Sequence, residues 1–156
     1  MELEKYLSDE VICLDLGVAK KDAAIRKLVD LLCDARGLGH RETILDTVFV
    51  REKEKSTGIG YGVAIPHART DIVGQIFLAM GRHKEGMDWG AMDGKPTQFI
   101  FLVVGPAKAS EDYLRVLADI SRLIKRADVR ASLLEATTSA KVLAIIRDTK
   151  PRENRV

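Results

Sequence analysis

A stretch of fifteen residues, STGIGYGVAIPHART, combines residue types that phosphate chemistry uses. Glycines stand at positions 58, 60 and 62, and a proline directly precedes His67. Glycines allow backbone amides to approach an anion closely, and a neutral imidazole is a nucleophile near neutral pH. Because Pro66 fixes its own φ and biases Ile65 toward an extended conformation, we expect His67 to end a stiff segment. A histidine buried for structural reasons fits the same local sequence equally well.

Two nucleotide-binding motifs are excluded by the residues around the glycines. A P-loop requires Gly-Lys-Ser/Thr after its second glycine, and the chain has no such triplet here. A dinucleotide fingerprint requires GxGxxG between a strand and a long helix. The spacing here is GxGxG, a predicted helix precedes it, and Pro66 prevents a helix from following.

The sequence also gives no support for a metal site or for serine-hydrolase chemistry. His40, His67 and His83 have no carboxylate or cysteine at ligand spacing, and the GxSxG motif of serine hydrolases is absent. The two cysteines, Cys13 and Cys33, form no CxxC pair and lie in apolar contexts, so we expect buried thiols. The sequence therefore predicts no metal and no cofactor.

The composition is that of an ordinary globular chain. Of its 156 residues 46% are hydrophobic and 31% are charged, with a net charge of +2. This balance gives no indication of a nucleic-acid partner or of membrane insertion, and the first ten residues lack the apolar region of a signal peptide. We expect a cytoplasmic protein with one domain over residues 1–150 and a charged tail over 151–156.

Helices and strands alternate along the chain. The apolar spacing predicts helices over 20–36 and 40–54, another capped by Ser110 and running through Ile124, and shorter ones over 127–136 and 139–148. A short strand or extended segment is predicted over 10–16, and strands are predicted over 75–83 and 97–105. The last is apolar almost throughout, as in a strand covered on both faces. The segment 56–70 is predicted as a loop. The fold class is α/β: a single sandwich domain with a mixed central β-sheet flanked by helices.

Two blocks of the chain match a known family. REKEKSTGIGYGVAIPH, residues 51–67, resembles the active-site signature of the fructose/mannitol-type IIA domains of the bacterial phosphoenolpyruvate-dependent sugar phosphotransferase system. AMDGKPTQFIFLVVGP, residues 91–106, resembles the second marker of that family, a turn that leads into a central strand. With no IIB, membrane or carrier domain expected in the chain, the stand-alone nitrogen-regulatory IIA proteins resemble it most.

The resemblance implies a phosphohistidine carrier. His67 would accept a phosphoryl group from HPr or its nitrogen-branch relative, and pass it to a IIB domain or use it to regulate partner proteins. Arg51 corresponds to the family's active-site arginine, and its forked donors suit phosphoryl oxygens, although an exposed cation at a helix end explains it too. The predicted phosphoryl pocket consists of Ser56, Thr57, Gly58, Gly60 and Tyr113.

Three residues depart from the family pattern. Ala68 stands where many members have glycine, Tyr61 stands in place of a common asparagine, and Tyr113 stands where many members have a second histidine. A tyrosine donates a hydrogen bond but carries no positive charge, and a purely structural role in the core explains it equally well. Two alternatives to a nitrogen-regulatory carrier therefore stay open: an interaction module with slow or vestigial phosphorylation, and a sugar-specific transport component.

Overall fold

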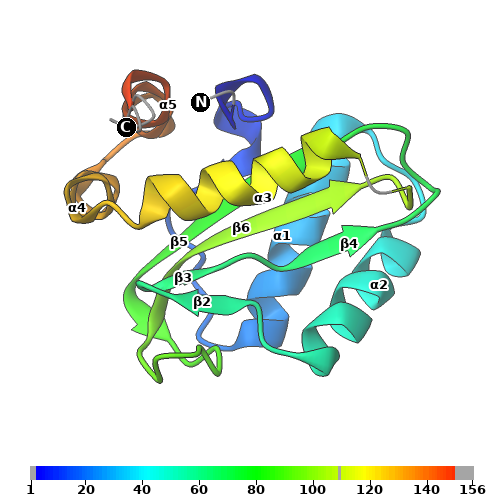
Figure 1. Ribbon diagram of the computed structural model, residues 1–156, viewed down its shortest axis with the longest axis horizontal. Coiled ribbons are helices and arrows are strands. Elements are labelled where there is room, and N and C mark those ends of the chain that lie inside the picture. Colours follow the sequence, from blue (N-terminus) through cyan, green and yellow to red (C-terminus); the bar gives the residue numbers. More distant parts are fainter. Residues whose placement is uncertain (1–2, 109, 150–156) are drawn as a thin grey trace, which may run out of the picture.

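The computed structural model describes residues 3–108 and 110–149, which form a mixed six-stranded sheet with helices on both faces (Figure 1). The strands are β1 (Ile12–Cys13), β2 (Gly58–Gly60), β3 (Val63–Ala64), β4 (His67–Arg69), β5 (Phe77–Met87) and β6 (Thr97–Gly105). The helices are α1 (Lys21–Arg36), α2 (Arg41–Glu54), α3 (Glu111–Ile124), α4 (Ala127–Glu135) and α5 (Ser139–Asp148). The expected α/β class with a mixed sheet is confirmed.

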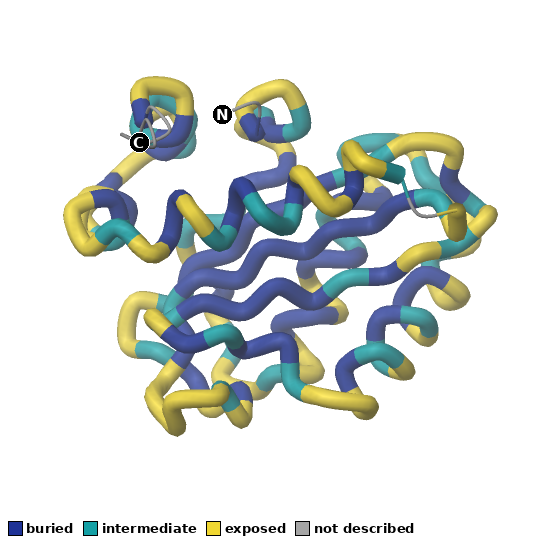
Figure 2. The backbone as a smooth tube through the Cα atoms, in the orientation of Figure 1, coloured by how far each residue is buried: buried dark blue, intermediate teal, exposed yellow. Residues whose placement is uncertain are grey.

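Strand β6 is the central strand of the sheet. Every residue of β6 except Gln98 is buried, and Figure 2 shows the middle of the sheet as continuous buried backbone. The strand order is β1-β5-β6-β3-β2: β5 runs antiparallel to β6 on one side, and β3 and β4 run parallel to it in succession on the other. A strand that is paired on both edges and covered on both faces needs the apolar run seen in the sequence.

The two faces of the sheet follow from the strand register, since residues paired across strands share a face. Leu16 and, from α1, Leu28 pack directly on Gly81, which pairs with Ile100, so α1 covers the face that holds Ile100. Helix α3 lies over the opposite face (Figure 1), where Tyr113 packs on Gly105. Alternation along β6 therefore assigns its odd-numbered residues to the α3 face.

Local signals set the helix ends. Gly37 adopts the left-handed conformation (φ 64°) at the C-terminal end of α1, which glycine reaches without strain. The hydroxyl of Ser110 accepts a hydrogen bond from the backbone N–H of Tyr113, and so caps α3 as the sequence predicts. All five predicted helices are present, with ends within two residues of those expected.

Three strand predictions need correction. The strand expected over 10–16 shrinks to β1, because 3-10 turns (Leu3–Lys5 and Asp9–Val11) lie ahead of it and the Asp15 carboxylate accepts the N–H of Gly17 to turn the chain. The strand expected over 75–83 is β5, which resumes pairing at Met87 after a register shift. The predicted loop 56–70 contains β2, β3 and β4, because each finds a strand edge to pair with.

The predicted tail, residues 151–156, lies outside the described residues. In the part of the chain that the structure describes, no helix combines the length and apolar character needed to cross a membrane.

Candidate functional site

His67 opens β4, on the edge of the central strand. The N–H of Ile65 donates to the carbonyl of Thr57 (3.0 Å), and the carbonyl of Pro66 accepts from the N–H of Val103 (3.0 Å). The backbone on the N-terminal side of His67 is therefore tied to both neighbouring segments. His67 itself pairs with Val103 and is half-buried. The segment is as constrained as its proline predicts.

The register brings His67, Arg69 and Tyr113 to one face of the sheet. His67 and Arg69 pair with Val103 and Gly105, both on the α3 face of β6, and residues two apart on a strand share a face. Tyr113, in the first turn of α3, covers that face, and its ring centroid lies 6.4 Å from that of His67 in an edge-on arrangement. The structure thus brings together two predicted site residues and a third, Arg69, that the sequence analysis did not select.

The hydrogen bond of the His67 ring selects its tautomer. Nδ1 lies 2.8 Å from the carbonyl oxygen of Ile65. A carbonyl only accepts, so Nδ1 carries the proton and Nε2 keeps a free lone pair. Burial lowers the pKa of His67 below 6.5, opposed by this hydrogen bond and assisted by the charge of Arg51. At neutral pH the ring is therefore a neutral nucleophile.

Arg51 lies in the last turn of α2 and contributes positive charge to the same pocket. Its Nη1 donates to the carbonyl of Lys55 at 2.7 Å, which orders the side chain at the helix end. The charge of Arg51 lowers the pKa of both His67 and Tyr113, so it acts on the two rings together. One of its two terminal nitrogens holds the backbone, and the other remains available to an anion.

Tyr113 is a buried residue whose hydroxyl has no hydrogen-bond partner among the described residues. Its exposed fraction is 2%, and burial raises its pKa to about 12 against the opposing charges of Arg69 and Arg51. A Cβ at position 105 would lie 2.6 Å from the ring, so the glycine of β6 makes room for it. An unpaired buried hydroxyl costs about 1–3 kcal/mol, and this hydroxyl is free to donate to an acceptor beside His67.

A buried polar network anchors α2 to the strands that carry His67. The Glu52 carboxylate accepts from the N–H of Thr57 (2.9 Å), from its hydroxyl (2.5 Å) and from Trp89 Nε1 (3.1 Å), and it pairs with Lys21 Nζ at 2.6 Å. Glu52 is adjacent to Arg51, so this network fixes the helix end on which Arg51 stands. The sequence analysis did not select Glu52, Lys21 or Trp89, and only the lone tryptophan in a polar segment signalled them.

The predicted pocket residues Ser56, Thr57 and Gly58 serve this scaffold. The Ser56 hydroxyl donates to the carbonyl of Trp89 (2.9 Å) and accepts the N–H of Gly58 (3.1 Å). The Thr57 hydroxyl is bound to Glu52. A Cβ on Gly58 would lie 2.8 Å from the Cα of Ala91, so this glycine is required for close packing of two loops. All three position the segment that leads to His67.

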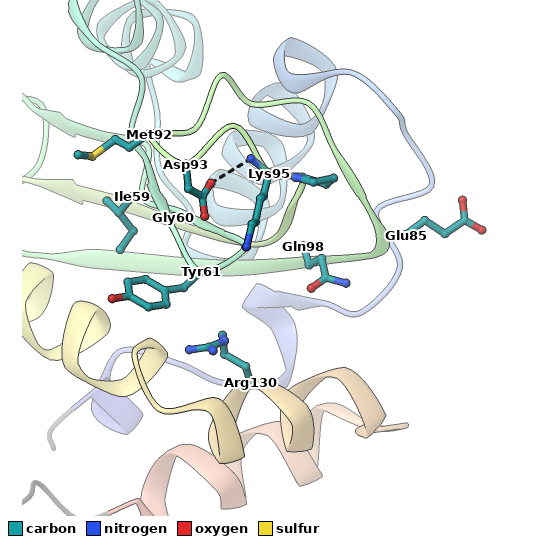
Figure 3. Close-up of a pocket in the computed structure, with 11 residues that line it drawn as sticks. Ile59, Gly60, Tyr61, Glu85, Met92, Asp93, Lys95, Gln98 and Arg130 are labelled. Atoms are coloured by element: carbon teal, nitrogen blue, oxygen red, sulfur yellow. Dashed lines mark hydrogen bonds between the residues drawn. The ribbon is translucent and has the colours of Figure 1, made fainter.

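The structure does not bring Gly60 to His67. Gly60 pairs with Val63, which pairs with Phe99, whereas His67 pairs with Val103. Four residues of strand separate the two levels by about 13 Å. Gly60 lines a cavity of about 700 Å³ at the other end of the sheet (Figure 3).

This cavity surrounds the β2–β3 turn. Tyr61 and Gly62 both have positive φ, 59° and 74°, as a two-residue type I′ hairpin requires. In Figure 3 the Tyr61 ring faces Arg130 of α4, whose guanidinium lies 5.2 Å from the ring centroid. Lys95 and Asp93 line the other wall (Figure 3), but the cavity contains no histidine, cysteine or other nucleophile poised by a base. It is therefore a concavity without evident chemistry.

His40 and His83 contribute nothing to the His67 pocket. His40 precedes α2 with positive φ, and His83 lies on β5. Across residues 3–108 and 110–149 no three potential metal ligands from His, Cys, Asp and Glu gather at one place.

Comparison with known proteins identifies the relatives of this chain. Residues 5–149 match the family described as phosphoenolpyruvate-dependent sugar phosphotransferase system, EIIA 2. A fructose-specific EIIA component of Haloferax volcanii is 40% identical over 89% of this chain and 90% of that protein. A nitrogen regulatory protein of Bradyrhizobium diazoefficiens is 32% identical over 92% of each.

Among solved structures, that of the nitrogen regulatory protein IIA-Ntr from Neisseria meningitidis superposes with a TM-score of 0.87 and 32% identity. The match covers 94% of this chain and 99% of that one. The sheet order, the helices and the segment that carries His67 therefore belong to a fold already seen in this family.

Proposed function

The chain belongs to the EIIA 2 family of the phosphoenolpyruvate-dependent sugar phosphotransferase system, and we propose that within it His67 is the residue that carries the phosphoryl group. One observation supports this above the others. The Nδ1–H of His67 is held by the carbonyl of Ile65, which leaves Nε2 as a free, neutral nucleophile in a pocket bordered by positive charge.

The chemistry that this arrangement supports is an in-line transfer between two imidazoles. The Nε2 lone pair of His67 attacks phosphorus as the phosphorus–nitrogen bond of a donor phosphohistidine breaks, and the bonding electrons stay on the donor ring. The Nδ1 proton remains on His67, where the Ile65 carbonyl stabilises the positive charge that the phosphorylated ring gains. Positioning and charge stabilisation do most of the work in such a transfer.

Arg51 and Tyr113 receive the phosphoryl oxygens in this proposal. The unused nitrogen of the Arg51 guanidinium offers a charge-assisted hydrogen bond, and the buried Tyr113 hydroxyl gains the acceptor that it lacks. Ser56, Thr57 and Gly58 position the strand. Gly60, which the sequence analysis placed in the pocket, has no part in this proposal.

The partners follow from the family. The donor is HPr or a nitrogen-branch HPr-like phosphocarrier, and the acceptor is a IIB domain or a regulated protein. Resemblance to two nitrogen regulatory proteins favours a regulatory role. The 40% identity to a fructose-specific EIIA component supports transport of fructose as the second candidate.

The test is incubation with phosphoenolpyruvate, enzyme I and HPr, followed by intact mass measurement. We expect one added phosphate, labile in acid and stable in alkali, that disappears in His67→Ala and persists in the matched controls His40→Ala and His83→Ala. Full labelling of His67→Ala would overturn the assignment. Transfer of the phosphoryl group from this protein to a fructose IIB domain would support the role in fructose transport. Absence of that transfer would favour the regulatory role.

A further inference from the structure

We propose that Arg69 is a second phosphoryl-binding cation, which rests above Tyr113 in the free protein and binds the oxygens of the phosphoryl group once His67 carries it. This inference rests on the function proposed above and adds a residue to the site. It assigns to the pocket two guanidinium groups, Arg51 from α2 and Arg69 from β4, whose charges both act on His67.

The strand geometry places Arg69 where a second cation is needed. His67 and Arg69 are two residues apart on β4 and pair with Val103 and Gly105, so both side chains project from the α3 face. Their Cα atoms are about 7 Å apart on an extended strand. A guanidinium on a long flexible stem spans that distance.

The guanidinium of Arg69 is unusually free. It lies 5.7 Å from the centroid of the Tyr113 ring, within the range of a cation–π interaction. In the described ranges it has no hydrogen bond and no ion pair, and the residue is exposed. By contrast, the buried Arg82 donates through Nε and Nη1 to four backbone carbonyls. Arg69 therefore keeps all five of its donors available.

The charge of the bound group requires more than Arg51. A phosphoryl group on a side chain carries between one and two negative charges near neutral pH, and one Arg51 nitrogen is already bound to the Lys55 carbonyl. The charges of Arg51 and Arg69 both reach His67 and Tyr113, as their effects on the two pKa values show. The Glu52 carboxylate acts in the opposite direction at His67, which increases the need for a second cation.

The cation–π contact with the Tyr113 ring keeps the Arg69 guanidinium near His67 in the free protein without blocking the imidazole. A cation–π contact at an exposed position is weak, so the guanidinium leaves the ring when an anion offers charge-assisted hydrogen bonds. The hydroxyl of the same tyrosine is buried and unpaired. Ring, hydroxyl and guanidinium thus form one side of the pocket in which the phosphoryl oxygens would lie.

The chain offers a matched control for the experiment. Arg130 also lies over a tyrosine, with its guanidinium 5.2 Å from the centroid of Tyr61, but that pair borders the cavity at the far end of the sheet. Arg69→Gln and Arg130→Gln each remove one guanidinium and one cation–π contact. Only the first removes charge from the His67 pocket.

The measurement follows the phosphoryl group itself. The full-length protein is phosphorylated with enzyme I and HPr, and the phosphorus NMR signal of its phosphohistidine is titrated with pH. Because a neighbouring cation favours the doubly ionised phosphoryl group, we expect Arg69→Gln to raise the titration midpoint and to slow phosphorylation about tenfold. Arg69→Lys should restore the midpoint and part of the rate, whereas Arg130→Gln should leave both unchanged.

The outcomes separate this inference from the proposed function. If the wild-type protein and Arg69→Gln titrate alike and are phosphorylated at rates within twofold, Arg69 is not a ligand and the inference is overturned while the function stands. Equal losses in Arg69→Gln and Arg130→Gln would also overturn it. A wild-type protein that accepts no phosphoryl group overturns both. Melting temperatures and Trp89 fluorescence confirm that each variant is folded.

Discussion

Two tyrosines at opposite ends of the same sheet each lie under an arginine, and they differ in almost everything else. Tyr61 is 49% exposed, has positive φ and borders an open cavity with Arg130. Tyr113 is 2% exposed, has an unpaired hydroxyl and borders His67 with Arg69. About 13 Å of strand separates the two levels of the sheet.

The site proposed for this chain rests on the groups gathered around His67 and not on the volume of a cavity. The cavity near Tyr61 has volume but no nucleophile, and its charged side chains include both signs. The surroundings of His67 hold a selected tautomer, a guanidinium without a hydrogen bond among the described residues and a buried hydroxyl without a partner. A buried hydroxyl without a partner is costly, and an anion at His67 would offset that cost for Tyr113.

The largest effect on stability should come from a change in the buried network around Glu52, which anchors α2 to the strands that carry His67. Glu52→Gln removes a buried charge and leaves Lys21 without its ion-pair partner at 2.6 Å. We expect the free energy of unfolding to fall by about 2–3 kcal/mol. Urea unfolding followed by Trp89 fluorescence measures this, because the indole N–H of the only tryptophan donates to Glu52. An equal loss in the control Glu85→Gln, which lines the Tyr61 cavity, would contradict the assignment.

Substitutions of Arg51 test how much its positive charge contributes to phosphoryl transfer at His67. Arg51→Ala removes a charge-assisted contact with the phosphoryl group, so transfer from phospho-HPr should slow by an order of magnitude or more, corresponding to about 1.5–3 kcal/mol. Arg51→Lys should recover part of the rate, since lysine lacks the planar fork. Rates are followed by rapid quench. If both variants transfer at the wild-type rate, Arg51 is only a helix-end cation that binds the Lys55 carbonyl.

The sequence alone predicted the central strand and the five helices from local signals, namely the apolar runs and the Ser110 cap. The rigid proline before His67 marked that histidine as a candidate, whereas Arg51 and Tyr113 were proposed from the family resemblance. The sequence did not predict the short strands β2, β3 and β4, because their pairing depends on the edge of a neighbouring strand rather than on their own composition. Arg69 was missed although its i, i+2 spacing from His67 is visible, because that spacing has meaning only after residues 67–69 are known to form a strand. Gly60 was grouped with the pocket residues by sequence proximity, but it lies at the turn end of β2 and lines the cavity near Tyr61.

Tyr113→Phe isolates one hydroxyl of the pocket. If that hydroxyl donates to the phosphoryl group, its loss should cost the phosphorylated state about 0.5–1.5 kcal/mol and shorten the phosphohistidine half-life by two- to tenfold. The unphosphorylated protein should be as stable as the wild type or more so, because an unpaired buried hydroxyl is removed. Half-lives at fixed pH and melting temperatures give both quantities. Tyr61→Phe is the matched control and should change neither, and a wild-type half-life in Tyr113→Phe would return Tyr113 to a structural role.

The lowered pKa of His67 predicts a modest dependence on pH. Since His67 acts as a neutral base, phosphorylation by HPr should stay level on the alkaline side and fall only below pH 6.5, where the ring takes up a proton. The same shift affects stability. The unfolded chain binds this proton more readily than the folded one, so the free energy of unfolding should decrease as the pH falls from 6.5 through the folded pKa. Urea midpoints compared between the wild type and His67→Gln measure this term, and identical slopes in the two proteins would refute it.

The smallest effect is expected at the other end of the sheet, where Tyr61 occupies a turn position that favours asparagine or glycine. Tyr61→Asn relieves the strain of a bulky residue at φ 59°, worth about 1 kcal/mol or more, and loses the contact with Arg130, worth about 0.5–1 kcal/mol at an exposed site. The protein should therefore melt at nearly the same or a slightly higher temperature, and phosphoryl transfer should stay within twofold of the wild type. Arg130→Gln removes the contact with the ring but keeps the strain at position 61, so it separates the two contributions. A fall in transfer rate in Tyr61→Asn as large as that in Arg69→Gln would show that the hairpin and its cavity take part in the chemistry, and that the two ends of the sheet are not independent.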